Sequence, residues 1–332
     1  MKILLTGATG VIGRRVVPLA LAAGHEVTAI VRSPPKAAAL GLGNARIVQV
    51  DLFDAGAVMH AVAGHDIVVN LATHMPSSSA RMLLRSAWRQ NDRIRRLASR
   101  NLVAGARGSS VQTFVQESFA PVYPDCGERW IDETIPITPA RYNESIQDAE
   151  HNALGFSDGG RRGIVLRFGA FYGADARHCM DLIHAVRKGW APLPGSPDAF
   201  ISSVTHIDAA HAVVTAFELP SGIYNITDDE PVPRRDYAGA LAAALGVPAP
   251  KFPPPGFKYL LGSAGRLLAR SQRISNRKFK QATGFTCRYP SVRSGWPAVI
   301  AELTSGGVAQ VAGQPAERRS RRTQSGRAQS GP

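Results

Sequence analysis

The sequence predicts an α/β fold of the Rossmann type, a doubly wound parallel sheet with a smaller C-terminal substrate cap. Two observations predict it. Short apolar runs alternate with helix-like stretches over the first 72 residues, and a glycine-rich turn, TGATGVIG at 6–13, directly follows the first of these runs. Such alternation is typical of a parallel sheet with helices on both faces.

The apolar runs predict six strands, in order, at 3–5, 26–31, 47–50, 67–71, 111–116 and 163–168. Residues with helical spacing predict helices at 11–23, 82–105, 145–154, 182–188, 209–218 and 237–245, the second of them as one long helix or two in series. Beyond residue 172 proline and glycine increase, which indicates a change of domain. The segment 304–332 has no apolar periodicity, and we expect it to be a disordered basic tail.

The composition limits the classes of function that this chain can have. The chain has 332 residues, of which 44% are hydrophobic and 19% charged, so it can bury a core. Its net charge of +14 is concentrated in 81–107 and in the tail, and no recognition motif accompanies it, which argues against nucleic-acid binding. We see no membrane span, no secretory signal and no metal-ligand spacing, and three well-separated cysteines fit a reducing cytosol.

The glycine turn predicts a dinucleotide site. Gly7 permits the tight turn, Gly10 lets the backbone approach a pyrophosphate, and Gly13 lets the helix pack close to the strand. Free N–H groups at the helix start favour the anionic phosphates. The predicted contacts within this turn are Thr6, Gly7, Ala8, Thr9, Gly10, Val11, Ile12 and Gly13.

The end of the second strand bears on the choice of coenzyme. An acidic residue there would bind the ribose 2′-OH of NAD, but this chain has Arg32, with Lys36 nearby. A guanidinium suits a 2′-phosphate, so we favour NADP and keep NAD as the alternative. Asp51 and Leu52 are placed to contact the adenine. Leu71, Ala72 and Thr73 would line the pyrophosphate and nicotinamide side.

Taken together, these motifs resemble the short-chain dehydrogenase/reductase superfamily, in its extended NAD(P)-dependent epimerase/dehydratase form. The matching segments are TGATGVIG, VDL at 50–52, NLA at 70–72, LRFGAFYG at 166–173, VTHIDAAHAVVTAFE at 204–218 and GIYNIT at 222–227. The resemblance implies a nucleotide-binding domain at 1–173, to which 201–228 returns, and a cap formed by 174–200 and 229–303. It also adds Phe168 and Tyr142 to the cofactor-binding residues.

The departures from the family pattern concern catalysis. The family uses a Ser or Thr after the fifth strand and a YxxxK pair, whose Lys lowers the pKa of the Tyr. Here Ser118 matches the first serine of the family motif, but Phe119 replaces the second; Tyr142 is present, but Ile146 replaces the lysine. Because a phenol without a nearby cation stays protonated at neutral pH, Tyr142 can donate a proton but is a poor base. Arg95 stands where the family often carries an active-site Asn.

Tyr142, Ser118 and Glu117 are therefore the catalytic candidates, and Glu117 could be an acid/base if burial raises its pKa. The function we predict is an NADP-dependent oxidoreductase acting on a small organic carbonyl or alcohol. Alternatives are a nucleotide-sugar epimerase or dehydratase with retained NAD, and a non-catalytic NADP sensor. The arginines spaced along 81–100 form either a solvated face or a contact for an acidic ligand, and the helix at 81–105 is a candidate homodimer interface.

Overall fold

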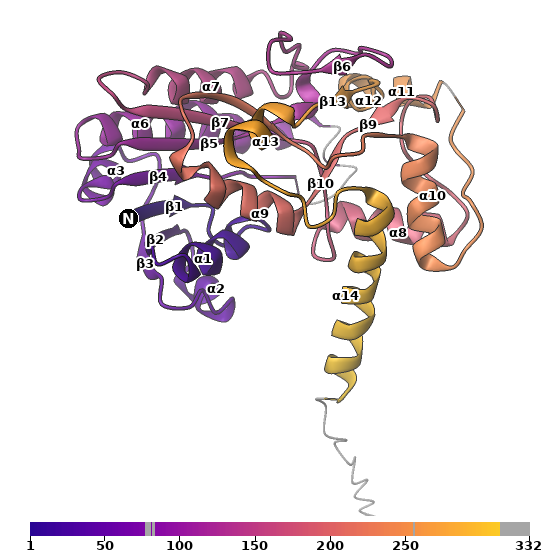
Figure 1. Ribbon diagram of the computed structural model, residues 1–332, viewed down its shortest axis with the longest axis horizontal. Coiled ribbons are helices and arrows are strands. Elements are labelled where there is room, and N and C mark those ends of the chain that lie inside the picture. Colours follow the sequence, from indigo (N-terminus) through magenta and orange to yellow (C-terminus); the bar gives the residue numbers. More distant parts are fainter. Residues whose placement is uncertain (77–80, 82–83, 255, 313–332) are drawn as a thin grey trace, which may run out of the picture.

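The computed structural model describes residues 1–76, 81, 84–254 and 256–312, and it has the predicted fold (Figure 1). Its centre is a seven-stranded sheet in the order β11-β7-β5-β4-β1-β2-β3, in which every pair is parallel. The strands are β1 (Lys2–Thr6), β2 (Glu26–Val31), β3 (Arg46–Gln49), β4 (Ile67–Asn70), β5 (Thr113–Phe119), β7 (Arg162–Phe168) and β11 (Gly222–Ile226). The doubly wound parallel sheet is thus confirmed.

Helices cover both faces of this sheet, and the alternation of side chains along each strand divides the core in two. On one face, α1 (Gly13–Ala22) and α9 (His206–Thr215) pack together over Ile3, Leu5 and Val115. On the other, Leu4, Val68 and Phe114 contact three helices. These are α3 (Ala55–Val62), α6 (Ser99–Arg107) and α7 (Ser145–Gly155). The remaining nucleotide-side helix, α2 (Pro34–Ala39), follows β2.

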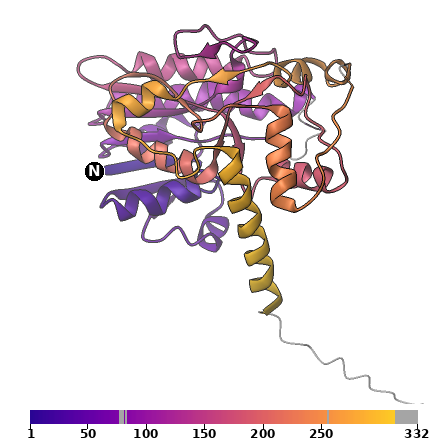
Figure 2. The same cartoon turned by 45° about the vertical axis from the view of Figure 1, so that its right-hand side comes forward.

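A second core lies beside the sheet, in the segment expected to form the cap. Tyr172, Tyr237 and Trp296 pack together there in edge-on and tilted pairs, with ring centroids 5.0–6.3 Å apart. The helices around them are α8 (Arg177–Arg187), α10 (Arg234–Leu245) and α14 (Val292–Ala312). In both views α14 extends away from the rest of the molecule (Figures 1 and 2).

Short strand pairs and helices complete the cap side. The strands are β6 (Trp130–Ile131), β8 (Ala170–Tyr172), β9 (Phe200–Ile201), β10 (Ser203–Thr205), β12 (Val232–Pro233) and β13 (Arg273–Ile274). The helices are α11 (Phe257–Leu260), α12 (Gly262–Leu268) and α13 (Arg277–Thr283). Because β11 is the edge strand of the central sheet and α9 packs on α1, much of 201–228 lies with the nucleotide-binding half.

Two segments differ from the sequence predictions. The helical run predicted over 82–105 has four parts, a 3₁₀ turn (Arg85–Trp88), α5 (Arg89–Arg93), a π-helical turn (Ile94–Ala98) and α6, and residues 82–83 lie outside the described residues. Helix α14 continues through 304–312, which the sequence assigns to the tail, and 313–332 lie outside the described residues. Within the described chain, no helix is long and apolar enough to cross a membrane.

Candidate active site

The glycine turn joins β1 to α1 and packs tightly against the end of β4. Gly7 has a φ of +72°, and a Cβ there would lie 2.4 Å from the Leu71 carbonyl oxygen. A Cβ on Gly13 would lie 2.2 Å from the Gly7 carbonyl oxygen, so no side chain fits. Gly10 is exposed, and its added Cβ would meet only the Gly7 oxygen, at 3.1 Å. The space beyond Gly10 is therefore open, and the turn fits the diphosphate of a dinucleotide.

Polar side chains cross-link the strand ends beneath this turn. Thr6 donates to Asn70 Oδ1 at 2.6 Å, and Asn70 Nδ2 donates to Gln116 Oε1 at 2.9 Å, which ties β1, β4 and β5 together. Of the predicted cofactor residues, Thr6, Ala8 and Phe168 are fully buried. Their side chains have no surface to offer a ligand, so they can support the site only from beneath.

The predicted adenine side is open to solvent. Arg32 is exposed at the end of β2, and Asp51 accepts the N–H of Phe53 at 3.0 Å. The Arg93 guanidinium lies 3.8 Å from the centroid of the Phe53 ring. On the nicotinamide side, the Ala72 N–H donates to Asn70 Oδ1 at 3.3 Å, which holds the segment of Leu71 and Thr73 at the end of β4.

Ser118 belongs to a buried polar network rather than to an open site. Its hydroxyl donates to Glu150 Oε1 at 2.5 Å, and Arg167 donates to both oxygens of Glu150, at 2.8 and 2.6 Å. Arg167 also donates to the Tyr123 hydroxyl, which in turn donates to Asn225. This network joins β5, α7, β7 and β11. The Ser118 hydroxyl is thus engaged in structure, although it remains a sequence-derived candidate.

Tyr142 lies in the turn just before α7, and Ile146 occupies the first turn of that helix, fully buried. The Tyr142 ring packs against Trp88 with centroids 5.0 Å apart. Burial raises the pKa of Tyr142 to about 12, although the positive charges of Arg95 and Arg270 oppose the shift. Tyr142 is therefore protonated at neutral pH, so it can donate a hydrogen bond but is a poor base.

Glu117 and Arg95 are buried groups whose charges act on each other, and the charge of Arg95 also acts on Tyr142. The Oε2 atom of Glu117 is buried and has no hydrogen-bond partner among the described residues. Burial raises the pKa of Glu117, while the positive charge of Arg95 lowers it. Arg95 lies in the π-helical turn with 6% of its surface exposed. Sequence reasoning noted Arg95 only as a departure from the family; its one signal was its place at the usual position of an active-site Asn.

Two buried amides near this pair were missed entirely. Asn91 accepts the His74 N–H at 2.9 Å but leaves its Nδ2 unpartnered, and neither polar side-chain atom of Asn143 has a partner within the described part of the chain. Buried amide groups are normally hydrogen-bonded, so unpaired ones at the carboxyl end of a sheet are consistent with a ligand site. Isolated Asn residues carry no pattern that would have pointed to them.

A cluster around Asp175 links the nucleotide-binding helix to the cap side. Asp175 follows β8 and accepts from Arg14 and from Arg15, the latter at 2.5 Å, while Nδ1 of His206 lies 2.6 Å from its other oxygen. Burial, with Arg15 and Arg14 nearby, lowers the pKa of His206, so its ring is neutral at pH 7. Arg14, which lies at the start of α1, is thereby committed to Asp175.

The arginines along 81–100 differ in their contacts. Arg93 covers Phe53, and Arg96 pairs with Asp148 at 2.8 Å with half of each side chain exposed. Arg89 and Arg100 are exposed, whereas the side chain of Arg85 lies outside the described part. The solvated-face alternative fits these contacts, and a homodimer through this helix remains a prediction.

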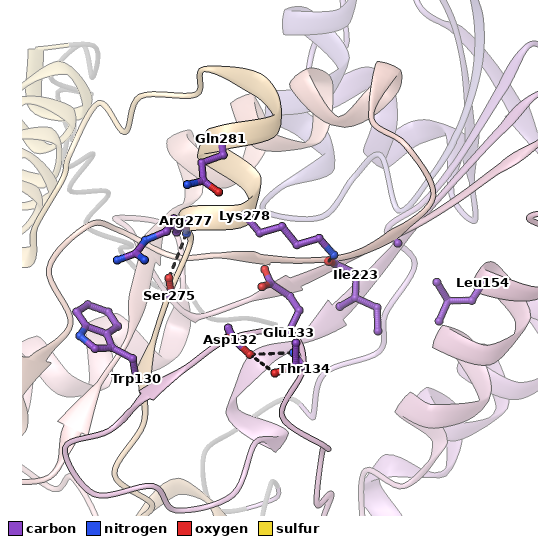
Figure 3. Close-up of a pocket in the computed structure, with 11 residues that line it drawn as sticks. Trp130, Asp132, Glu133, Thr134, Leu154, Ile223, Ser275, Arg277, Lys278 and Gln281 are labelled. Carbon is purple, nitrogen blue, oxygen red and sulfur yellow. Dashed lines mark hydrogen bonds between the residues drawn. The ribbon is translucent and has the colours of Figure 1, made fainter.

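A hollow of about 730 Å³ lies beside β11, an edge strand of the central sheet (Figure 3). The glycine turn follows β1, which is an interior strand of the same sheet. In the hollow, Glu133 accepts the N–H of Asn225 at 2.7 Å, and Lys278 donates to the Ile223 carbonyl at 2.7 Å. These two side chains hydrogen-bond to backbone groups of the edge strand β11 that could otherwise pair with another strand. The residues that line the hollow include none from the glycine turn.

Comparisons with known proteins agree with this geometry. A family model described as NAD(P)H-binding matches residues 7–153. A 3-diazoavenalumate denitrifying reductase of Streptomyces sp is 32% identical over 314 residues, which cover 89% of this chain and 99% of the relative. A 2-alkyl-3-oxoalkanoate reductase of Stenotrophomonas maltophilia is 29% identical over 75% of this chain and 77% of its own. The structure of the human epimerase family protein SDR39U1 with NADPH superposes with a TM-score of 0.76 at 20% identity, covering 91% and 100% of the two chains.

Proposed function

The chain belongs to the extended short-chain dehydrogenase/reductase superfamily, and on that premise we propose that it is an NADP-dependent oxidoreductase of a small organic carbonyl or alcohol. The observation that carries the proposal is the turn at 6–13, where Gly7 and Gly13 admit no side chain and Gly10 faces open space. The family is one of NAD(P)-binding reductases and epimerases. The choice of NADP and of substrate is our own inference.

The residues present fit a bound dinucleotide. Backbone N–H groups of 7–13 would hold the diphosphate, Arg32 the 2′-phosphate, Asp51 and Leu52 the adenine, and 71–73 the nicotinamide side. The bound coenzyme would supply the hydride. Tyr142 would donate a hydrogen bond to the substrate oxygen, and Glu117 would give and take the proton. Ser118 would fix Glu150 and so the position of α7.

Arg32 provides the test of coenzyme choice. Arg32→Ala should weaken NADPH binding by roughly 10- to 100-fold, the worth of one charge-assisted contact, and leave NADH binding unchanged. Calorimetric titration with both coenzymes measures this. Arg46→Ala is the matched control. Arg46 is also exposed, but it lies at the start of β3, whereas Arg32 follows the end of β2. Equal loss for both coenzymes, or no loss, would refute the NADP preference.

Diazonium compounds are a second substrate class. They are favoured by the similarity to the 3-diazoavenalumate denitrifying reductase, because the match covers 99% of that relative. Replacement of a diazonium group by hydride breaks the C–N bond and releases dinitrogen, and it transfers no proton to oxygen. That chemistry does not need the family's lysine, which Ile146 replaces here. A parallel screen of carbonyl compounds and diazonium carboxylates, followed by NADPH absorbance and product mass, separates the two classes. Coenzyme binding without any turnover would instead favour the sensor alternative.

A further inference from the structure

The hollow beside β11 contains groups that protection of the edge strand does not explain. Glu133 and Lys278 hydrogen-bond to that strand. Trp130, Arg277 and Gln281 also line the hollow, but among the described residues they make no hydrogen bond to β11. The same three residues also line a second hollow, of about 440 Å³. Concave places of this kind are where proteins bind small molecules, so we asked what these three side chains would recognise.

Trp130 offers an aromatic surface. It lies in β6, pairs with Arg273 of β13, and is 51% exposed. The Arg273 guanidinium lies 4.3 Å from the centroid of the Trp130 ring system and 5.2 Å from the centroid of the Phe200 ring. Arg273 therefore holds the indole from one side, while half of the residue is open to solvent. An indole held in this way is suited to packing against a planar ring.

Arg277 supplies a positive charge beside this aromatic surface. It is the first residue of α13 and is exposed, and its backbone N–H donates to Ser275 at 3.2 Å. Its guanidinium has no hydrogen bond or ion pair within the described chain. Figure 3 shows Arg277 and Trp130 on the side of the hollow away from Leu154. Gln281 follows Arg277 by four residues, which places it on the same face of α13.

The carboxylates that line the two hollows are already engaged or buried. Asp132 accepts the N–H and the hydroxyl of the threonine two positions further on, at 3.0 and 2.5 Å. Glu133 holds the edge strand, and Asp229 pairs with Lys280 at 2.9 Å. Asp228 is only 2% exposed. The charge that lacks a partner in this part of the described chain is therefore the guanidinium, which favours an anionic ligand over a cationic one.

We propose that this place is a second ligand site and that it binds a planar aromatic anion. The ring of the ligand packs on Trp130, its carboxylate or phosphate group pairs with Arg277, and Gln281 makes a further hydrogen bond. The planar fork of an arginine suits both kinds of anionic group. The proposal goes beyond the oxidoreductase function and does not depend on it, because the glycine turn contributes nothing to this lining.

The indole N–H signals of the protein provide a test that needs no activity. The chain has four tryptophans, and Trp130→Phe identifies the signal of Trp130 in a nitrogen–proton correlation spectrum by its loss. Titration with a naphthalene carboxylate and, separately, with a naphthyl phosphate should shift this signal. We expect a Kd on the order of 1 mM or lower, as for a small ligand held by one ring contact and one ion pair. The two probes distinguish a carboxylate ligand from a phosphate ester.

Arg277→Ala should weaken the better of the two probes by roughly 3- to 10-fold, because an exposed charge-assisted contact is lost. Arg129→Ala is the matched control. Arg129 is exposed and directly precedes Trp130, but it lines neither hollow, so its loss should leave the Kd unchanged. Naphthalene methanol, which keeps the ring without the charge, should bind the wild type about as weakly as the anionic probe binds Arg277→Ala.

Three results would overturn the site. The Trp130 signal could stay in place with both anionic probes at about 10 mM, well above the expected Kd. The Kd could be equal in the wild type and in Arg277→Ala, or naphthylmethylamine, a cationic probe with the same ring, could bind more tightly than either anion. Displacement of the probe by saturating NADPH would also place it in the coenzyme site. Absence of heat on titration with NADPH and NADH would remove the oxidoreductase proposal and leave the outcome at Trp130 unaffected.

Discussion

Gly10 and Gly13 lie three residues apart in one turn, yet alanine should act on them differently. At Gly13 the new Cβ would overlap the Gly7 carbonyl oxygen at 2.2 Å and the Ala8 Cα at 2.8 Å, both backbone atoms. Gly13→Ala should therefore destabilise the fold by several kcal/mol, on the order of a severe packing error. At Gly10 the contact is 3.1 Å, so Gly10→Ala should fold with a small loss but bind NADPH weakly.

Thermal unfolding and calorimetry on the same preparations measure both effects. Gly239→Ala is the control, because Gly239 lies in α10 and its added Cβ would meet nothing within 4 Å. It should be neutral or stabilising by about 0.5–1 kcal/mol. A Gly10→Ala variant with unchanged coenzyme affinity would contradict the proposal that the glycine turn binds the diphosphate.

Asp228 should make the stability of the protein depend on pH. It is 2% exposed; its Oδ2 accepts from Ser203 at 2.9 Å, but Oδ1 has no partner among the described residues. Burial raises the pKa of Asp228 well above its usual value. Because the folded state keeps a proton that the unfolded state releases above about pH 4, stability falls as pH rises from there toward the folded pKa.

Asp228→Asn cannot ionise, so its stability relative to wild type should be unchanged or lower at pH 4 and should improve as pH rises to 8. Urea unfolding at both pH values measures this. Asp229→Asn is the neighbouring control. Asp229 pairs with Lys280 at 2.9 Å, and its replacement should cost about 0–1 kcal/mol at both pH values. The same pH trend in both variants would argue against a buried proton on Asp228.

The elements show where sequence reasoning succeeds and where it stops. Apolar runs predicted the first six strands of the central sheet because buried parallel strands are continuous apolar segments. A helical run at 82–105 was also predicted, as one long helix or two in series, and the structure divides it into four parts. Arg95, in the π-helical turn, is buried, whereas Arg93 and Arg96 are exposed. No composition or spacing rule indicates a π-helical turn, so the sequence predicted the helical run but not this irregularity within it.

The network of Glu150 holds α7 against the sheet, and its loss should be costly. Glu150→Ala would leave Arg167 buried without its carboxylate, with 5% of its side chain exposed, and should cost roughly 3–5 kcal/mol. The double variant Glu150→Leu, Arg167→Met should recover much of this, because neither buried charge remains. Urea unfolding of both variants measures the difference. A double variant as unstable as the single one would show that packing, rather than the unpaired charge, dominates.

At the scale of the whole molecule, the sequence predicted the nucleotide-binding half better than the cap. The strand–turn–helix at the start is local, so it can be read from adjacent residues. The edge position of β11 pairs Gly222 with Ile164 of β7, and the packing of α9 on α1 joins helices that begin at residues 206 and 13. Only the family resemblance indicated either arrangement. The Asp175 cluster is of the same kind, because its members come from α1, the segment after β8, and α9.

Asp175 should therefore couple the coenzyme site to the cap side. Asp175→Asn removes the charge that Arg14 and Arg15 share and the acceptor beside His206, although the arginines keep 30% and 20% of their side chains exposed. We expect a loss of roughly 1–3 kcal/mol, less than for a fully buried pair. Because the proposed diphosphate site lies at the N-terminus of α1, we expect NADPH affinity to fall as well. Asp198→Asn, at an exposed pair with Arg235, is the control and should change neither quantity. Unfolding curves with and without saturating NADPH separate the effect on stability from the effect on coenzyme affinity. If the variant is less stable but NADPH stabilises it as much as the wild type, the Asp175 cluster supports the fold alone.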